Sequence, residues 1–242
     1  MTNKIYGVLI ASICVAAITT WSLAAPASKP RDEKLELPTP QQFDTSATNL
    51  RLIGLGIHNY GDTNNVLPSN VVSKDNKPLL SWRVQILPYI EEDELYKQFK
   101  LDESWDSENN KKLIGRMPKL YAPIRVKREK GLTFYRSFTG SNGVMTGKYQ
   151  LGNIPDGTSN TFMVAEGAKP VVWTQPAELE FNGKEVPELG GMFEGKFHAL
   201  MGDGSVYRFR KGVNAATLRL LIDPADGNVL PEELGHDDEE KK

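Results

Sequence analysis

The chain has 242 residues, enough for one domain with a sizeable core but too few for two roomy enzyme domains. Its 29 basic and 31 acidic residues give a formal net charge of −2. This balance provides no general attraction to nucleic acid or to anionic lipid, so we expect no nucleic-acid partner. The only cysteine, Cys14, lies in an apolar stretch, which excludes a disulfide framework.

The N-terminus carries an export signal. Lys4 precedes an uncharged, largely apolar stretch from Ile5 to Ala25, and small residues allow cleavage after Ala24 or after Ala27. The same stretch is long enough to span a bilayer, so residues 1–25 are either a cleaved signal peptide or an uncleaved membrane anchor. Both alternatives place the rest of the chain outside the cytoplasm, in the periplasm, on the cell surface or in the medium.

Residues 26–44 are rich in Pro, Lys, Glu and Gln, which predicts a tether that cannot fold alone. The next segment has Leu50, Ile53, Ile57 and Tyr60 at helical spacing, and Gly61 suits the position just after a helix. Two glycines within this helix weaken it, so we expect close packing against a neighbour.

Further helices are expected from Leu87 to Phe99, from Ser107 to Met117 and over residues 214–222. Short apolar runs separated by Gly, Asn, Asp and Pro predict antiparallel strands over residues 132–138, 161–166, 196–201 and 205–210. Residues 231–242 read as an acidic, disordered tail. The sequence thus predicts an α+β domain over residues 45–230, with an N-terminal helix packed on an antiparallel sheet and additional short helices.

The dipeptide Asp203–Gly204 lies between two of the predicted strands. Gly adopts a positive φ without steric penalty and Asp tolerates it, so this pair predicts a structural turn and not an acid of an active site. Asp156–Gly157 is interpreted in the same way, because an Asp side chain caps its own turn.

No spacing in the sequence indicates a metal or a nucleophile, and we expect no cofactor. The three histidines, His58, His198 and His236, are far apart, and the motifs of serine and cysteine hydrolases are absent. Oxygen-rich loops around Asp62, Asp156 and Asp223 leave a calcium site open, although none has the spacing of an EF-hand.

Several long segments, taken in order, resemble a bacterial family of unknown function. They are NLRLIGLGIHNYGDTNNVLPSN, LSWRVQILPYIEEDELYKQFKLDESWDSENNKKLIGRMPKLYAPI, IPDGTSNTFMVAEGAKPVVWTQPAEL and HALMGDGSVYRF, and the resemblance covers about Ala47 to Ile222. The family carries a C-terminal motif described as prepilin-type processing-associated, a His, nine residues and then Asp–Gly. The resemblance implies a pilin-like domain.

This chain departs from that family at two places. The prepilin leader is replaced by an export segment and a Pro-rich tether, which argues against filament assembly. The motif histidine is replaced by Phe193, so any role of that histidine in relatives is lost here.

These observations predict a non-catalytic, exported envelope protein with a structural or binding role. Its partner is expected to be an envelope protein or a surface polymer, with the membrane contacted through residues 5–25 if these are retained. His58, Asp62 and Trp173 are candidate binding residues, although tryptophans such as Trp173 usually lie in cores. The alternative is a carbohydrate-active hydrolase that uses Asp62 or Asp203 as acid or base, which requires a pocket holding two acids.

Overall fold

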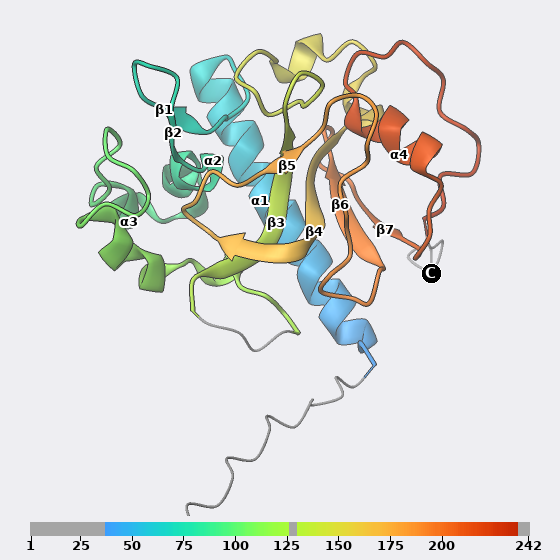
Figure 1. The fold of residues 1–242 in the computed structure, drawn as a ribbon. Helices are drawn as coiled ribbons and strands as arrows, with labels where there is room; N and C mark the ends of the chain where they lie inside the picture. Colours follow the sequence, from blue (N-terminus) through green and yellow to red (C-terminus); the bar gives the residue numbers. More distant parts are fainter. Residues whose placement is uncertain (1–36, 126–129, 237–242) are drawn as a thin grey trace, which may run out of the picture. The chain divides into compact units, whose positions relative to one another are not determined.

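The computed structural model describes residues 37–125 and 130–236 (Figure 1). Its mixed helices and strands confirm the predicted α+β class. The predicted signal or anchor, most of the tether and residues 237–242 lie outside these described residues. The helices are α1 (Pro40–Asn64), α2 (Trp82–Gln85), α3 (Asp93–Tyr96) and α4 (Ala215–Ile222), with 3-10 turns η1 (Leu87–Ile90), η2 (Asn110–Arg116), η3 (Lys119–Tyr121), η4 (Leu151–Asn153) and η5 (Thr158–Asn160).

The strands form a small hairpin and a larger sheet. The hairpin pairs β1 (Val71–Val72) with β2 (Pro78–Leu80), and the sequence did not predict it. The larger sheet has the order β5-β3-β4-β6-β7, from β3 (Leu132–Thr139), β4 (Phe162–Val172), β5 (Leu179–Glu180), β6 (Phe197–Met201) and β7 (Val206–Phe209). Its pairs are antiparallel except that the short β5 runs parallel to β3, so the sheet is not purely antiparallel as expected.

Helix α1 begins earlier and ends later than the sequence analysis predicts. Thr39 caps it: its hydroxyl accepts from the Gln42 backbone N–H (3.3 Å) and its own N–H donates to the Gln42 side chain (3.0 Å). This reciprocal capping box, followed by Pro40 in the first turn, sets the start inside the predicted tether, whose composition hid the signal. At the other end Asn65 takes the left-handed conformation (φ 55°), so Gly61 lies inside the helix and not after it.

The two glycines within α1 allow the expected close packing. A Cβ at Gly54 would lie 2.8 Å from Leu200 Cδ1 of β6, and one at Gly56 would lie 2.6 Å from Ile90 Cγ2 of η1. These distances are shorter than real contacts of a Cβ atom. Both positions therefore require glycine as long as α1 lies at its present distance from β6 and η1.

The predicted helix from Leu87 to Phe99 is wrong as one continuous element. Within these residues the chain forms η1 and α3, and the break between them is at Glu91, which adopts a left-handed conformation (φ 63°). The segment from Ser107 to Met117 is helical but as the 3-10 turn η2. Helix α4 matches its prediction, with Asn214 as the capping residue.

Both faces of the large sheet are buried. Alternate residues of β6 point to opposite sides, and each side belongs to a different core. His198 and Leu200 face α1, whose residues Leu50, Ile53 and Ile57 belong to the same core. Phe197, Ala199 and Met201 face α4 and join a second core with Leu218, Leu221 and Ile222. The sheet therefore lies between α1 and α4 (Figure 1).

The first residues of the predicted tail are part of the fold. His236 forms an antiparallel bridge with Phe209, the Arg210 backbone N–H donates to the Gly235 carbonyl (3.0 Å), and the Arg210 and Glu233 side chains form an ion pair (2.8 Å). The expectation of disorder is therefore wrong for residues 231–236, because this segment lies along the free edge of β7.

Candidate functional site

Asp203 and Gly204 form the turn between β6 and β7. The Asp203 carboxylate accepts from the Ser205 backbone N–H (2.9 Å) and from the Ser205 hydroxyl (2.6 Å), and Gly204 has a φ of +88°. The turn is also bonded to the segment before β4, because the Asp203 N–H donates to the Thr158 carbonyl (3.1 Å). The carboxylate is thus occupied within its own turn, as an Asx turn requires.

His58 fixes this turn to α1. Its Nε2 lies 2.9 Å from the Gly202 carbonyl oxygen, within hydrogen-bond distance, and the side chain is partly buried. Asp62, one turn later on α1, is exposed. The structure therefore brings His58 to the Asp203 turn, but in a contact with backbone.

Asp156 and Gly157 hold a second pair of distant segments together. The Asp156 carboxylate accepts from the backbone N–H groups of Asp226 (2.8 Å) and Gly227 (3.1 Å), in the loop after α4. Gly157 has a φ of +89° immediately before η5. The oxygen-rich loops around Asp156 and Asp223 thus meet. The contact consists of hydrogen bonds from backbone N–H groups to the Asp156 oxygens, and not of oxygens placed around a calcium ion.

Trp173 is a core residue. Its side chain is fully buried, its indole N–H donates to the Ile114 carbonyl (2.9 Å), and it packs against Phe99 and Tyr121. The candidate role of Trp173 in binding is therefore wrong, because no ligand can reach the ring. Trp82 is likewise buried, whereas Trp105 is partly exposed.

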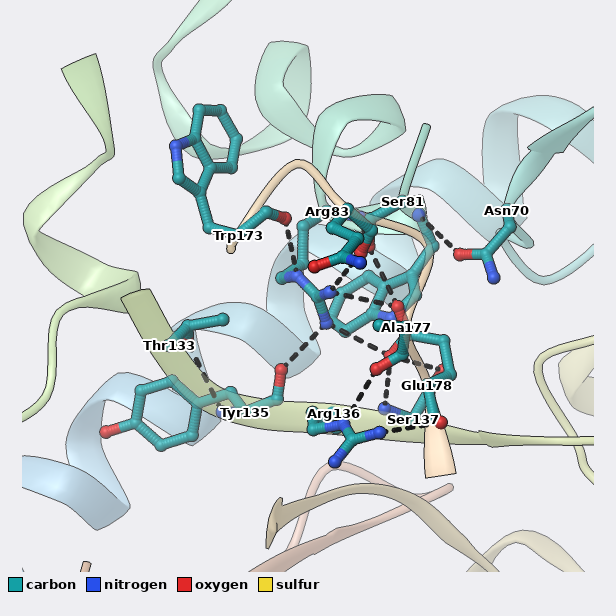
Figure 2. Close-up of polar contacts among 12 residues, drawn as sticks. Asn70, Ser81, Arg83, Thr133, Tyr135, Arg136, Ser137, Trp173, Ala177 and Glu178 are labelled. Atoms are coloured by element: carbon teal, nitrogen blue, oxygen red, sulfur yellow. Dashed lines mark hydrogen bonds and ion pairs between the residues drawn. The ribbon is translucent and has the colours of Figure 1, made fainter. Parts of the chain in front are cut away.

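The most extensive polar contact of the described residues is centred on Arg83 and Glu178, and the sequence analysis missed it (Figure 2). Both side chains are fully buried and form a bidentate ion pair, with Nη2 2.9 Å from Oε1 and Nη1 3.1 Å from Oε2. Such a pair tolerates burial only when its remaining hydrogen-bonding groups are satisfied.

Backbone groups supply these remaining partners. Arg83 donates to the carbonyls of Trp173 (2.8 Å), Tyr135 (2.9 Å) and Gln175 (3.1 Å), and Glu178 accepts from the Ser137 N–H (3.0 Å). The ion pair thereby joins α2, β3 and the segment after β4, which are far apart in sequence. Arg83 and Glu178 lie in the segments SWRV and TQPAE, and only the resemblance of those segments to a family could have drawn attention to them.

A second buried cluster lies between α1 and the sheet. Ser46 donates to Glu166, the Tyr135 hydroxyl lies 2.7 Å from Ser46 Oγ, and Glu166 also accepts from the His198 backbone (2.9 Å) and lies 3.2 Å from His198 Nδ1. Burial, followed by the Glu166 charge, raises the pKa of Tyr135 above its usual range, so this phenol stays neutral.

Ser, His and Glu are the residue types of a hydrolase triad, but their arrangement differs from one. A triad needs the serine hydroxyl bonded to histidine Nε2, whereas Ser46 bonds to Glu166 and His198 Nε2 lacks a partner among the described residues. Phe43 and Phe193 pack around the imidazole, and Phe193 occupies the position of the motif histidine. The cluster therefore fixes α1 to the sheet and has no access for a substrate.

Two hollows of the surface could receive a ligand. One, of about 360 Å³, lies between the loop before α4 and residues 233–235; the other, of about 220 Å³, lies around Arg136 and Lys169. Neither is lined by Asp62 or Asp203, and across residues 37–125 and 130–236 no group of three His, Cys, Asp or Glu side chains is placed to hold a metal. Within the same ranges no helix has the length and apolar character to cross a membrane.

Part of the chain matches a known protein family. Residues 45–126, about a third of the chain, match the family model SBP_bac_10, described as a protein of unknown function (DUF1559). The resemblance to a bacterial family of unknown function is thereby confirmed for this segment, which contains most of α1 and Arg83. The match does not extend to the Asp203 turn, and it does not test the pilin-like character. No curated protein and no solved structure matches the chain.

Proposed function

We propose that the protein is an exported, non-catalytic component of the bacterial cell envelope, with a pilin-like domain that has a structural or binding role and does not polymerise. The observation that carries the proposal is that the polar side chains named above are bonded to the protein's own backbone. Asp203, Asp156 and the Arg83–Glu178 pair each bond to the backbone of another segment or of their own turn. Groups used in this way hold a fold together and are not free to transfer protons to a substrate.

Export rests on the N-terminal sequence. An uncharged stretch of 21 residues after Lys4, followed by a Pro-rich segment, is typical of a secreted or membrane-anchored domain. The capped N-terminus of α1 lies within the last residues of this segment, which supports an order of parts in which a folded domain follows a tether.

A fusion of alkaline phosphatase to the C-terminus of the full chain tests export, because this enzyme is active only outside the cytoplasm. We expect an active fusion, and we expect a double substitution Leu9→Arg/Val15→Arg to abolish its activity by interrupting the apolar stretch. Equal activity of the two fusions, or an inactive parent fusion that is fully expressed, would reject the proposal. Leu52→Arg, an exposed change in α1, is the matched control and should leave the activity unchanged.

A further inference from the structure

Three tyrosines lie on three elements that pack together, α1 against η1 and η1 against α3. Tyr60 of α1, Tyr89 of η1 and Tyr96 of α3, here called the tyrosine cluster, are all partly exposed. The rings of Tyr60 and Tyr89 pack edge to face with centroids 5.6 Å apart. Partly exposed tyrosines at one place supply apolar ring surface and hydroxyl groups together, a combination that is enriched at binding surfaces.

Uncharged side chains hold two of these rings in position. The Tyr60 hydroxyl donates to Gln85 Oε1 (2.6 Å), and Gln85 is itself fixed by donating to the Ser69 carbonyl (2.7 Å). Asn64 donates both to the Tyr89 hydroxyl (3.1 Å) and to the Tyr60 carbonyl (2.8 Å). A surface whose side chains are fixed before binding loses less conformational entropy when a ligand arrives.

The side chains of the tyrosine cluster are uncharged, and the residues from Glu91 to Glu94, which separate Tyr89 from Tyr96 in sequence, are all acidic. Burial, and then the neighbouring phenols, raise the pKa of Tyr60 and of Tyr96, and no carboxylate or cation contributes to either shift. Lys97, next to Tyr96, is bonded to Asp93 and Glu94. Within the described part of the chain the Tyr96 hydroxyl has no hydrogen-bond partner, and the Tyr89 hydroxyl accepts from Asn64 with its own proton unused. Hydrogen-bonding capacity therefore remains at the tyrosines, and the segment from Tyr89 to Lys97 offers no unpaired cation to an anionic ligand.

We propose that the tyrosine cluster binds a neutral polysaccharide. Aromatic ring faces pack against the C–H faces of sugar rings, and phenol and amide groups match sugar hydroxyls in both donor and acceptor roles. An anionic polymer would lose hydration at this surface and would meet the acidic side chains of Glu91 to Glu94 without gaining an opposite charge. This inference rests on the proposed function and specifies its surface polymer.

Affinity electrophoresis of the full chain in native gels tests the inference. The gels contain hydroxyethylcellulose, dextran or galactomannan as neutral polymers, or carboxymethylcellulose as an anionic polymer with the same backbone as the first. We expect retardation by at least one neutral polymer and none by carboxymethylcellulose. Tyr89→Ala and Tyr96→Ala should each weaken this binding about tenfold, which corresponds to roughly 1.4 kcal/mol, as for an aromatic residue at the centre of an interface.

Two variants separate the role of the tyrosine cluster from general effects. Tyr207→Ala, at an exposed tyrosine of β7, should bind as the parent does. Tyr96→Phe keeps the ring and loses only the unused hydroxyl. The variant should therefore bind more tightly than Tyr96→Ala, and the substitution requires no change in the fold.

Four results would overturn the inference: no retardation by any neutral polymer, retardation by carboxymethylcellulose alone, binding unaffected by the tyrosine substitutions in folded variants, or loss of self-association in those variants without glycan binding. In each case an active phosphatase fusion would leave the proposed export intact, so the two proposals fail separately.

Discussion

Arg83 and Glu178 show at the level of single residues how a buried charge is stabilised and what its removal costs. Arg83→Leu leaves the Glu178 carboxylate buried without its cation, and we expect the free energy of unfolding to fall by about 3–5 kcal/mol. The double variant Arg83→Leu/Glu178→Leu removes both charges and should recover part of this loss. Urea unfolding followed by circular dichroism measures all three proteins.

The exposed ion pair between Arg210 and Glu233 provides the control. Glu233→Gln should change the free energy of unfolding by less than about 1 kcal/mol, because an exposed pair is solvated in both states. If Arg83→Leu were no more harmful than this control, the buried pair would not stabilise the fold as described here.

Substitutions at Asp203 test whether this residue stabilises a turn or acts as a catalytic acid. Asp203→Ala removes the acceptor for the Ser205 N–H, and we expect a loss of about 1 kcal/mol, the usual net contribution of one hydrogen bond. Asp203→Asn keeps an acceptor oxygen and should retain most of the stability. Differential scanning fluorimetry of both variants checks the expectation, and an unchanged melting temperature for Asp203→Ala would contradict it.

These residues also show which contacts a sequence predicts. The Asp203 turn depends on three neighbouring residues, so local turn chemistry was enough to predict it. Arg83 and Glu178 are 95 residues apart and meet only after β3 and β4 have paired, and neither has a local pattern that marks it. Trp173 was assigned to two roles because aromatic residues serve both in cores and at surfaces.

At the scale of elements, the glycines of α1 give a paired test of close packing. Gly56→Ala places a Cβ 2.6 Å from Ile90 Cγ2, and we expect it to destabilise the domain by about 1–3 kcal/mol. Gly61→Ala is in the same helix, but its nearest neighbour would be 3.7 Å away. This control should stabilise the domain by up to about 1 kcal/mol through better helix propensity. Chemical denaturation of both variants makes the comparison, and equal effects would show that packing at Gly56 is not tight.

Elements were predicted where one pattern dominates and mispredicted where two compete. Helix α4 has an Asn cap and a single apolar face, so its limits follow from sequence. The sequence predicts one helix over Leu87 to Phe99, yet Glu91 turns left-handed and divides this segment, a conformation that sequence does not mark for glutamate. The capping box at Thr39 and Gln42 was readable, but the Pro-rich composition around it favoured a tether.

For the whole molecule, the sequence predicted the class of fold, but not the burial of both sheet faces. Alternation along β6 puts apolar residues on both sides, and short runs of this kind do not reveal whether one face or two will be covered. The free edge of β7 is bordered by residues 235–236, whose polar composition gave no strand signal.

The central claim concerns where the protein acts, and the intact mass of the protein in each fraction of its native host tests it most directly. We predict that the chain is found in the membrane fraction with residues 5–25 retained, or in an extracytoplasmic fraction beginning near Ala25 or Ser28. A full-length chain found only in the cytoplasmic fraction would contradict the account.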